Sequence, residues 1–169
     1  MEEKVSHPSH YQHAGYECLD IARCFCFDLG NAYKYVWRAG EKKEQGLSGQ
    51  EKAFEDYSKA ITYMKDYLCH MGYSVLKKPE GINFNDLEGS FEEPKRGILK
   101  SFHMLFDDDA PVEQIAKNIL FDLRLNTYSA ERYIAIERAA KSFAEKYSGE
   151  DIESAFCNGA EWAIEHRLT

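Results

Sequence analysis

The sequence lacks any stretch of about 18 consecutive apolar residues, the length that a membrane-spanning helix needs. Its opening residues, MEEKVSHPSH, are too polar to contain the apolar segment of a signal peptide. We therefore expect a cytoplasmic protein that makes no contact with a membrane.

Familiar motifs of nucleotide and ester chemistry are also missing. The phosphate-binding loop GxxxxGK[ST] is absent, and so are GxGxxG after a strand, GxSxG and HExxH. The conventional templates for kinases, dehydrogenases and hydrolases therefore do not fit this chain.

Basic residues are in the minority, since 21 Lys and Arg stand against 29 Asp and Glu, a formal charge of −8. Proteins that bind duplex nucleic acid carry a broad basic footprint, so we expect no such partner, and any anion site must be local. The five cysteines are an odd number at irregular spacing, which predicts free thiols rather than a disulfide framework. With only 4 Pro and 44% hydrophobic residues, the chain can bury a core.

The N-terminal part shows helical patterns. Residues 16–29 suit a short helix that ends at Gly30, and residues 31–39 suit a second short helix. Ser48 and Glu51 have the spacing of a capping box, in which each side chain satisfies a backbone donor of the other residue at a helix start.

The third helix, which begins at this box, carries apolar residues at steps of three and four and is expected to stop at Gly72. The residues of this apolar seam are Phe54, Tyr57, Ile61, Met64, Leu68 and Met71.

Residues 77–97 combine two of the four prolines with Gly, Asn and acidic residues and show no period, which predicts a linker or long loop. Beyond it we expect four helices: one over about 98–106, one that starts at Pro111, one capped by Ser129 and one that follows Ser148.

The sequence thus predicts a mainly α protein with a three-helix module over 1–76 and a C-terminal helical bundle over 98–169, joined by the long loop. Residues 73–76 and 82–84 are the candidates for minor extended pieces.

The densest group of functional side chains is Gly30-Asn-Ala-Tyr-Lys-Tyr-Val-Trp-Arg-Ala-Gly40. On a helix, Asn31, Lys34, Tyr35 and Arg38 share one face, and two cations without an acid between them indicate an anion site. The alternative is that these cations pair with acids of the next helix, namely Glu51, Glu55 or Asp56.

Two further groups are candidates. His10 and Tyr11 lie in a Pro-containing loop ahead of the first helix, a position where binding residues often occur. A zinc site that uses His7, His10, His13 and Cys18 is disfavoured because the spacing matches no closed Cys/His pattern, and the remaining alternatives are helix-capping or exposed imidazoles. On the capped helix, Asp56, Lys59 and Tyr63 share a stripe, either as ligands or as a rim of hydrogen bonds and ion pairs.

Taken in order, the motifs HPSHY, GNAxKYxWRAG and EDxxKAxxY resemble a family of small phage-encoded proteins of mostly unknown function that includes a nucleotide kinase without a Walker motif. The resemblance covers residues 5–67. It implies a phage protein, located in the cytoplasm of the infected bacterium, that acts on nucleotides by phosphorylating nucleoside monophosphates, particularly deoxy ones. The matched positions are His10, Tyr11, Asn31, Lys34, Tyr35, Trp37, Arg38, Asp56, Lys59 and Tyr63.

Chemistry assigns roles within this set. Phosphoryl transfer needs charge neutralisation, positioning and usually Mg²⁺. We expect Arg38, Asp56 and Lys59 to be the catalytic group, and Glu55 and Asp56 to hold Mg²⁺ if the protein is an enzyme. The residues expected to bind the nucleotide are His10, Tyr11, Asn31, Lys34, Tyr35, Trp37, Arg38, Lys59 and Tyr63.

Three other functions stay open. The same residues suit a sponge that sequesters nucleotides or cyclic nucleotide immune signals without turnover, an anti-defence role. A metal-dependent nucleotide pyrophosphohydrolase would draw on Glu41, Glu44, Glu51, Glu55 and Asp56. The last alternative is an adaptor for another protein. Because each half is small and its helix seams are long, we also expect a homo-oligomer.

Overall fold

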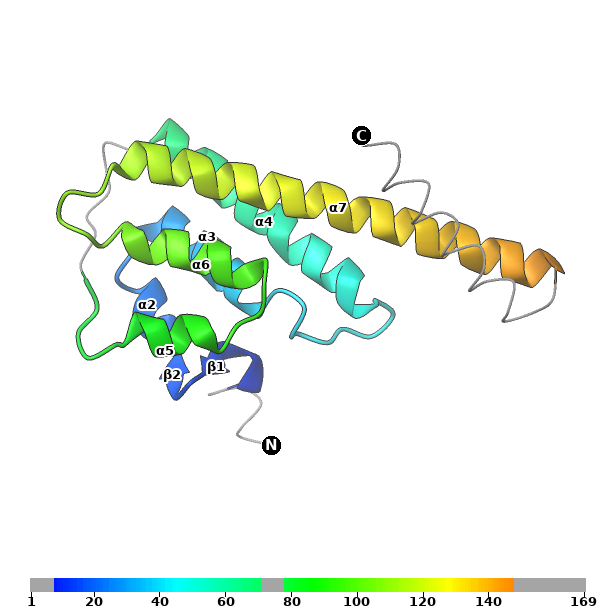
Figure 1. Cartoon of the computed structure of the whole chain (residues 1–169), viewed down its shortest axis with the longest axis horizontal. Coiled ribbons are helices and arrows are strands. Elements are labelled where there is room, and N and C mark those ends of the chain that lie inside the picture. Colours follow the sequence, from blue (N-terminus) through cyan, green and yellow to red (C-terminus); the bar gives the residue numbers. More distant parts are fainter. Residues whose placement is uncertain (1–7, 71–77, 148–169) are drawn as a thin grey trace. The chain divides into compact units, whose positions relative to one another are not determined.

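The computed structural model describes residues 8–70 and 78–147. In chain order the elements are η1 (Ser9–Tyr11), β1 (Gln12–His13), β2 (Tyr16–Glu17), α2 (Cys18–Ala22), α3 (Phe27–Arg38), α4 (Gly49–Cys69), α5 (Phe84–Gly89), α6 (Lys95–Met104) and α7 (Val112–Tyr147) (Figure 1). The mainly α prediction is confirmed. Within the described part of the chain, no helix has the length and apolar character needed to cross a membrane.

The chain divides into two compact units, Met1–Thr127 and Tyr128–Thr169, so the boundary lies far beyond the expected linker at 77–97. The first unit has one hydrophobic core, which extends from Cys18 to Leu123. Helix α3 is its centre, since it contacts α2, α4 and α6 (Figure 1). Helix α6 and the start of α7 therefore share a core with the N-terminal helices instead of forming a separate bundle.

A two-stranded hairpin precedes the helices and was not expected from the sequence. Strand β1 pairs antiparallel with β2, with His13 opposite Tyr16. The connecting residues Ala14 and Gly15 both have positive φ, 49° and 81°, as the tightest two-residue hairpin turns require. Because each strand has only two residues, no alternating pattern could reveal them.

The expected helix end at Gly30 is wrong. Helix α2 ends at Ala22, and α3 begins at Phe27 and continues through Gly30 to Arg38. A Cβ on Gly30 would lie 2.6 Å from the carbonyl oxygen of Ala22, so this glycine lets the end of α2 approach α3. The residue serves close packing and does not stop the helix.

The capping box at the start of α4 is confirmed, because Ser48 accepts from the backbone of Glu51 and Glu51 accepts from that of Ser48. The helix ends at Cys69, and the expected stop at Gly72 lies outside the described residues. Its buried face includes Tyr57 and Met64 of the predicted seam.

The expected long loop at 77–97 contains a helix. Helix α5 begins after Asn83, whose side chain accepts a hydrogen bond from the backbone of Asn85. Leu87 and Phe91 are buried, and the Phe91 ring packs edge-on against Trp37 with 5.0 Å between centroids. These apolar residues are too few to make a visible helical period, yet they dock the segment onto the core.

Helix α7 begins directly after Pro111, as expected, but it merges two predicted helices into one. Ser129 lies inside it and caps nothing. The polar residues before Ser129 do not break the helix, because Asn126 and Thr127 donate back to the carbonyl oxygens of Asp122 and Leu123. The helix expected after Ser148 and the extended piece at 73–76 lie outside the described residues, and residues 82–84 form no strand.

Candidate functional site

The sequence-predicted residues meet where α3 packs against α4. Arg38 is in the last turn of α3 and is only 8% exposed. Its Nη2 donates to Oδ1 of the fully buried Asp56 at 2.8 Å, and its Nη1 donates to the hydroxyl of Tyr11 at 3.0 Å. Burial disfavours the charge, but the hydrogen bonds with Asp56 and Tyr11 outweigh it and raise the pKa of Arg38. Arg38 therefore has the acidic partner that the alternative interpretation named.

The ring of Tyr35 gathers three cations. The guanidinium carbon of Arg38 lies 4.6 Å from the ring centroid, and the ammonium groups of Lys34 and Lys59 lie at 4.8 and 5.7 Å. Tyr63 of α4 stacks on the same ring, with 5.8 Å between centroids and 18° between planes. We call Lys34, Tyr35, Arg38, Lys59 and Tyr63 the Tyr35 cluster. Cations close to an aromatic face are attracted by its quadrupole, which offsets part of their mutual repulsion.

Of the three cations around Tyr35, Lys34 is the one without a carboxylate partner in the described ranges. Its ammonium donates to Oδ1 of Asn31 at 2.8 Å, and within residues 8–70 and 78–147 no carboxylate forms an ion pair with it. Burial and the nearby charge of Arg38 lower the pKa of Lys34. Asn31 also donates to the carbonyl oxygen of Phe27 at 2.8 Å, which fixes the side chain that holds Lys34. A ligand anion would balance this charge.

The predicted magnesium ligands already bind cations. Glu55 lies between Lys52, at 2.7 Å, and Lys59, and their ammonium groups lower its pKa to about 2. Asp56 is fully buried against Arg38. In the described ranges, no three His, Cys, Asp or Glu side chains come together as a metal site. Glu55 and Asp56 thus do not form a preformed Mg²⁺ site, and a metal ion there would have to displace a cation.

Lys52 is a site residue that sequence reasoning missed. Its side chain is buried, its ammonium pairs with Glu44 at 2.9 Å and with Glu55, and it lies 3.9 Å from Asp56. The spacing of Lys52 to Glu55 and Asp56, three and four residues along one helix, was the available signal.

His10 and Tyr11 are in η1, beside Arg38. Their ring centroids are 4.5 Å apart, and burial together with the charges of Arg38 and Lys42 lowers the pKa of His10, which favours the neutral imidazole. The described residues of the alternative zinc site have other partners or are buried. His13 is paired with Glu41 at 2.7 Å, Cys18 is buried with a raised pKa, and His7 lies outside the described residues.

Trp37 is not part of the site. Its side chain is fully buried and packs edge-on against Phe91 and His13, so it has no surface for a nucleotide. On α3 it falls one turn from Tyr33, which is equally buried, and this face of the helix points into the core. In this structure its ring therefore has no exposed face for a base.

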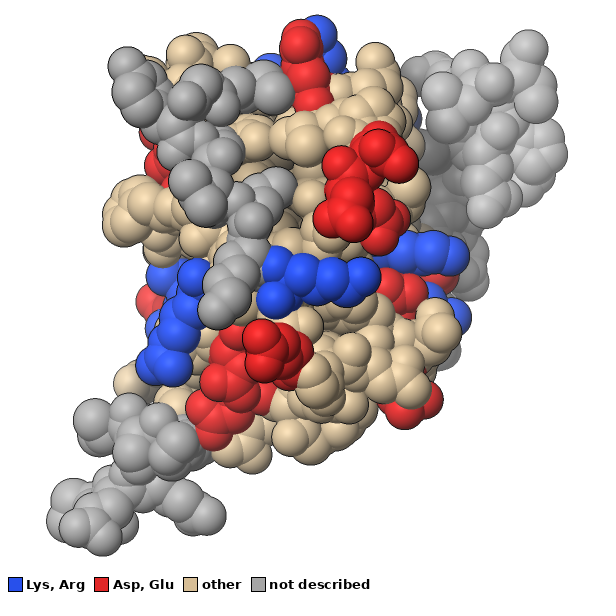
Figure 2. Space-filling model, turned by 90° about the vertical axis from the view of Figure 1, so that its left-hand side faces the viewer, with Lys and Arg blue, Asp and Glu red and all other residues tan. Residues whose placement is uncertain are grey.

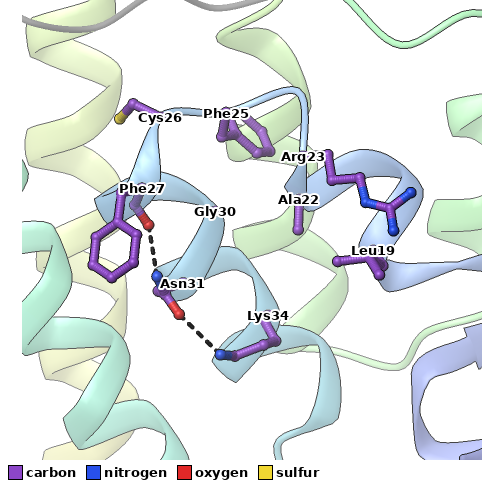
Figure 3. A pocket seen from close by; sticks show the side chains of 9 residues that line it. All are labelled: Leu19, Ala22, Arg23, Phe25, Cys26, Phe27, Gly30, Asn31 and Lys34. Carbon is purple, nitrogen blue, oxygen red and sulfur yellow. Dashed lines mark hydrogen bonds between the residues drawn. The ribbon is translucent and has the colours of Figure 1, made fainter. Parts of the chain in front are cut away.

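A cleft between α2 and α3 adjoins the Tyr35 cluster and was not predicted (Figure 3). Its volume is about 300 Å³ and its walls are mainly carbon. Leu19 and Ala22 come from α2, and Phe27, Gly30, Asn31 and Lys34 come from α3, with Arg23, Phe25 and Cys26 between the helices. No sequence signal marks it, because it depends on how closely Gly30 lets the two helices approach.

The surface carries a mixture of charges. Figure 2 shows Lys and Arg side chains in a band across the middle of one face, with groups of Asp and Glu above and below it. Such a surface suits a local anion site better than a broad contact with a phosphate backbone.

Residues 5–65 match the family described as a protein of unknown function (DUF3310). The match includes every residue of the Tyr35 cluster and covers 61 of the 169 residues of the chain. The searches of curated proteins and of solved structures found no match. The family description states no activity, so a function has to be argued from the geometry of the site.

Proposed function

We propose that the N-terminal part of this chain binds a nucleotide at the Tyr35 cluster, in the cytoplasm of a phage-infected bacterium as the family resemblance implies. The observation that carries the proposal is the meeting of Lys34, Arg38 and Lys59 around one aromatic ring, while Lys34 has no carboxylate partner in the described part of the chain. Ammonium groups bind phosphate oxygens through charge-assisted hydrogen bonds. The stacked rings of Tyr35 and Tyr63 add an aromatic surface beside these cations.

The cations have different roles in this proposal. Lys34 and Lys59 are half-buried and contact the phosphates. Arg38 is a positioning residue, because both of its terminal nitrogens already donate to Asp56 and Tyr11. By its stacking on Tyr35, Arg38 fixes the ring around which the two ammonium groups gather.

Phosphoryl transfer to a nucleoside monophosphate, the activity that the resemblance implies, is one outcome of this binding. With Glu55 and Asp56 held by cations, Mg²⁺ would arrive with the phosphates of the donor nucleotide. The engagement of both carboxylates favours the second candidate, a sponge that holds nucleotides or cyclic nucleotide signals without turnover.

A pyrophosphohydrolase is not favoured by the geometry. Such an enzyme needs carboxylates that are free to hold metal ions. Here Glu41 binds His13 and Lys95, Glu44 binds Lys52, and Glu51 completes the capping box.

The binding proposal is tested with Lys34→Ala and Lys59→Ala, and Lys100→Ala on the exposed face of α6 is the matched control. Calorimetric titration with deoxynucleoside mono- and triphosphates, with and without Mg²⁺, measures the affinity. We expect each cluster variant to bind about tenfold more weakly, since each loses one hydrogen bond to a charged group, and the control to bind like the wild type. Wild-type affinity in both cluster variants, with unchanged helical circular dichroism, would rule the site out.

Turnover is tested separately. The protein is incubated with Mg²⁺, a deoxynucleoside monophosphate and a nucleoside triphosphate labelled on its γ-phosphate, then denatured, and the nucleotides are separated. A new labelled diphosphate identifies a kinase, whereas return of both nucleotides unchanged identifies a sponge.

We also propose that the chain self-associates. Phe121 and Leu125 lie one turn apart on α7 and are 65% and 55% exposed, an apolar surface that a second copy would cover. Sedimentation of the wild type and of a Phe121→Ser, Leu125→Ser variant tests this, with a lower mass expected for the variant.

A further inference from the structure

The cleft between α2 and α3 is held open by backbone geometry. Its floor is the contact between Gly30 and the Ala22 carbonyl, where a Cβ would not fit. Figure 3 shows Leu19 and Arg23 on the α2 side, with Phe27 and Lys34 on the α3 side. The spacing of the two helices here therefore depends on one close approach of the main chain, between Gly30 and the Ala22 carbonyl.

Large apolar side chains stand in solvent at the edge of this cleft. Phe27 is 75% exposed and Leu19 is 50% exposed, although the core of the same unit lies beside them. Exposed apolar groups at the rim of a concave site are typical of a ligand-binding site. About 300 Å³ lies at the lower end of ligand pockets, roughly 300–1,000 Å³, which fits one base and its sugar better than two.

Two contacts join the cleft to the Tyr35 cluster. Lys34 lines the cleft, and its ammonium also lies 4.8 Å from the Tyr35 ring centroid. Phe27 lines the cleft and packs edge-on against Tyr63, with 6.0 Å between centroids, and Tyr63 in turn stacks on Tyr35. A molecule in the cleft would thus place its other end at the cations.

Two positive charges line the cleft. Arg23, the residue that follows α2, is exposed, and Lys34 comes from α3, so two cations flank a mainly carbon surface. This pattern matches a ligand with an apolar planar part and a negative group.

We infer that this cleft is the base-binding subsite of the proposed nucleotide site, and that its ligand is a nucleoside phosphate with a single base whose phosphate lies at Lys34. The inference rests on the proposed function. Asn31 uses one N–H on the Phe27 carbonyl and one oxygen lone pair on Lys34, so its amide keeps one donor and one acceptor for a base edge. The rest of the cleft that faces a base is mainly carbon, so size and apolar contact supply most of the selection.

The test compares the four deoxynucleoside 5′-monophosphates with inorganic phosphate as calorimetric probes. Phe27→Ala and Leu19→Ser remove apolar surface from opposite walls of the cleft, and both residues are exposed enough that the fold should survive, which circular dichroism checks. Met104→Ala is the matched control, since Met104 is also an exposed apolar residue but lies on α6. We expect Phe27→Ala to lower the affinity for each nucleotide roughly tenfold, because the variant loses most of the contact between the phenyl ring and the base. Its affinity for inorganic phosphate should stay unchanged.

The outcomes separate this inference from the proposed function. If Phe27→Ala and Leu19→Ser bind every nucleotide like the wild type while Lys34→Ala binds them more weakly, the base lies elsewhere and only the Tyr35 cluster stands. If the wild type binds neither phosphate nor any nucleotide, both proposals fall. A change in sedimentation of Phe27→Ala without a change in nucleotide affinity would instead identify the cleft as a contact between copies of the chain and overturn the inference.

Discussion

Arg38 of α3 and Asp56 of α4 form a hydrogen-bonded ion pair of 2.8 Å in the interior of the first unit, with side-chain exposures of 10% and 0%. Asp56 Oδ2 and Arg38 Nε are buried without a partner among the described residues. A buried charge that loses its partner is much more costly than an exposed one, so this pair governs both the stability of the α3–α4 contact and the position of the Tyr35 ring.

We predict that Asp56→Asn lowers the free energy of unfolding by about 3–5 kcal/mol, because it leaves the Arg38 guanidinium buried without a counter-charge. Urea denaturation followed by circular dichroism measures this. Glu113→Gln is the control, since it breaks an exposed pair with Lys117 and should leave the unfolding midpoint unchanged. Equal unfolding midpoints for the two variants would mean that the buried pair contributes no more to stability than the exposed one.

Gly30→Ala should destabilise the fold by about 1–3 kcal/mol, because the new methyl group would push against the Ala22 carbonyl and force α2 away from α3. Thermal unfolding gives the comparison with Gly49→Ala, which replaces a helical glycine that has open space around its Cβ position. A Gly30→Ala protein as stable as Gly49→Ala would contradict the close approach on which the cleft depends.

Tyr33, His103 and Glu88 form a hydrogen-bonded chain in the core, with 2.9 Å from the Tyr33 hydroxyl to His103 Nε2 and 2.7 Å from His103 Nδ1 to Glu88. Tyr33→Phe leaves the imidazole nitrogen unpaired in a buried place, at a cost of about 1–3 kcal/mol. Urea denaturation measures the loss, and Tyr128→Phe at an exposed tyrosine is the control. An unchanged Tyr33→Phe midpoint would show that the hydroxyl adds nothing to the core.

Glu55 predicts a pH dependence of stability. The ammonium groups of Lys52 and Lys59 lower its pKa from 4.5 to about 2 in the folded protein, so the folded state binds fewer protons than the unfolded state between these values. Its contribution is complete above pH 4.5 and is lost as the pH falls toward 2. Urea midpoints of wild type and Glu55→Gln should therefore differ most above pH 4.5 and converge near pH 2.

The control for this titration is Glu92→Gln, an exposed carboxylate without an ion pair to another residue in the described ranges. This variant corrects for the loss of one exposed carboxylate. A difference between Glu55→Gln and the wild type that stays constant over the same pH window would remove Glu55 from the acid sensitivity of the protein.

The sequence by itself determined the features that depend on neighbours within one helix. The capping box of Ser48 and Glu51, the apolar seam of α4, the start of α7 after Pro111 and the shared face of Lys34, Tyr35 and Arg38 all follow from spacings of three and four residues. Helix ends were harder to place. Gly and Ser are residue types that often occur at helix ends, but Gly30 and Ser129 lie within helices.

Only the tertiary structure decided which of these side chains are available to a ligand. In the folded protein Trp37 is buried, and Arg38 pairs with the carboxylate of Asp56. Lys34 has the amide of Asn31 as its partner, and a cleft lies beside Gly30. The physical reason is that each of these outcomes depends on the distance between two helices, and that distance is fixed by the packing of residues far apart in the chain.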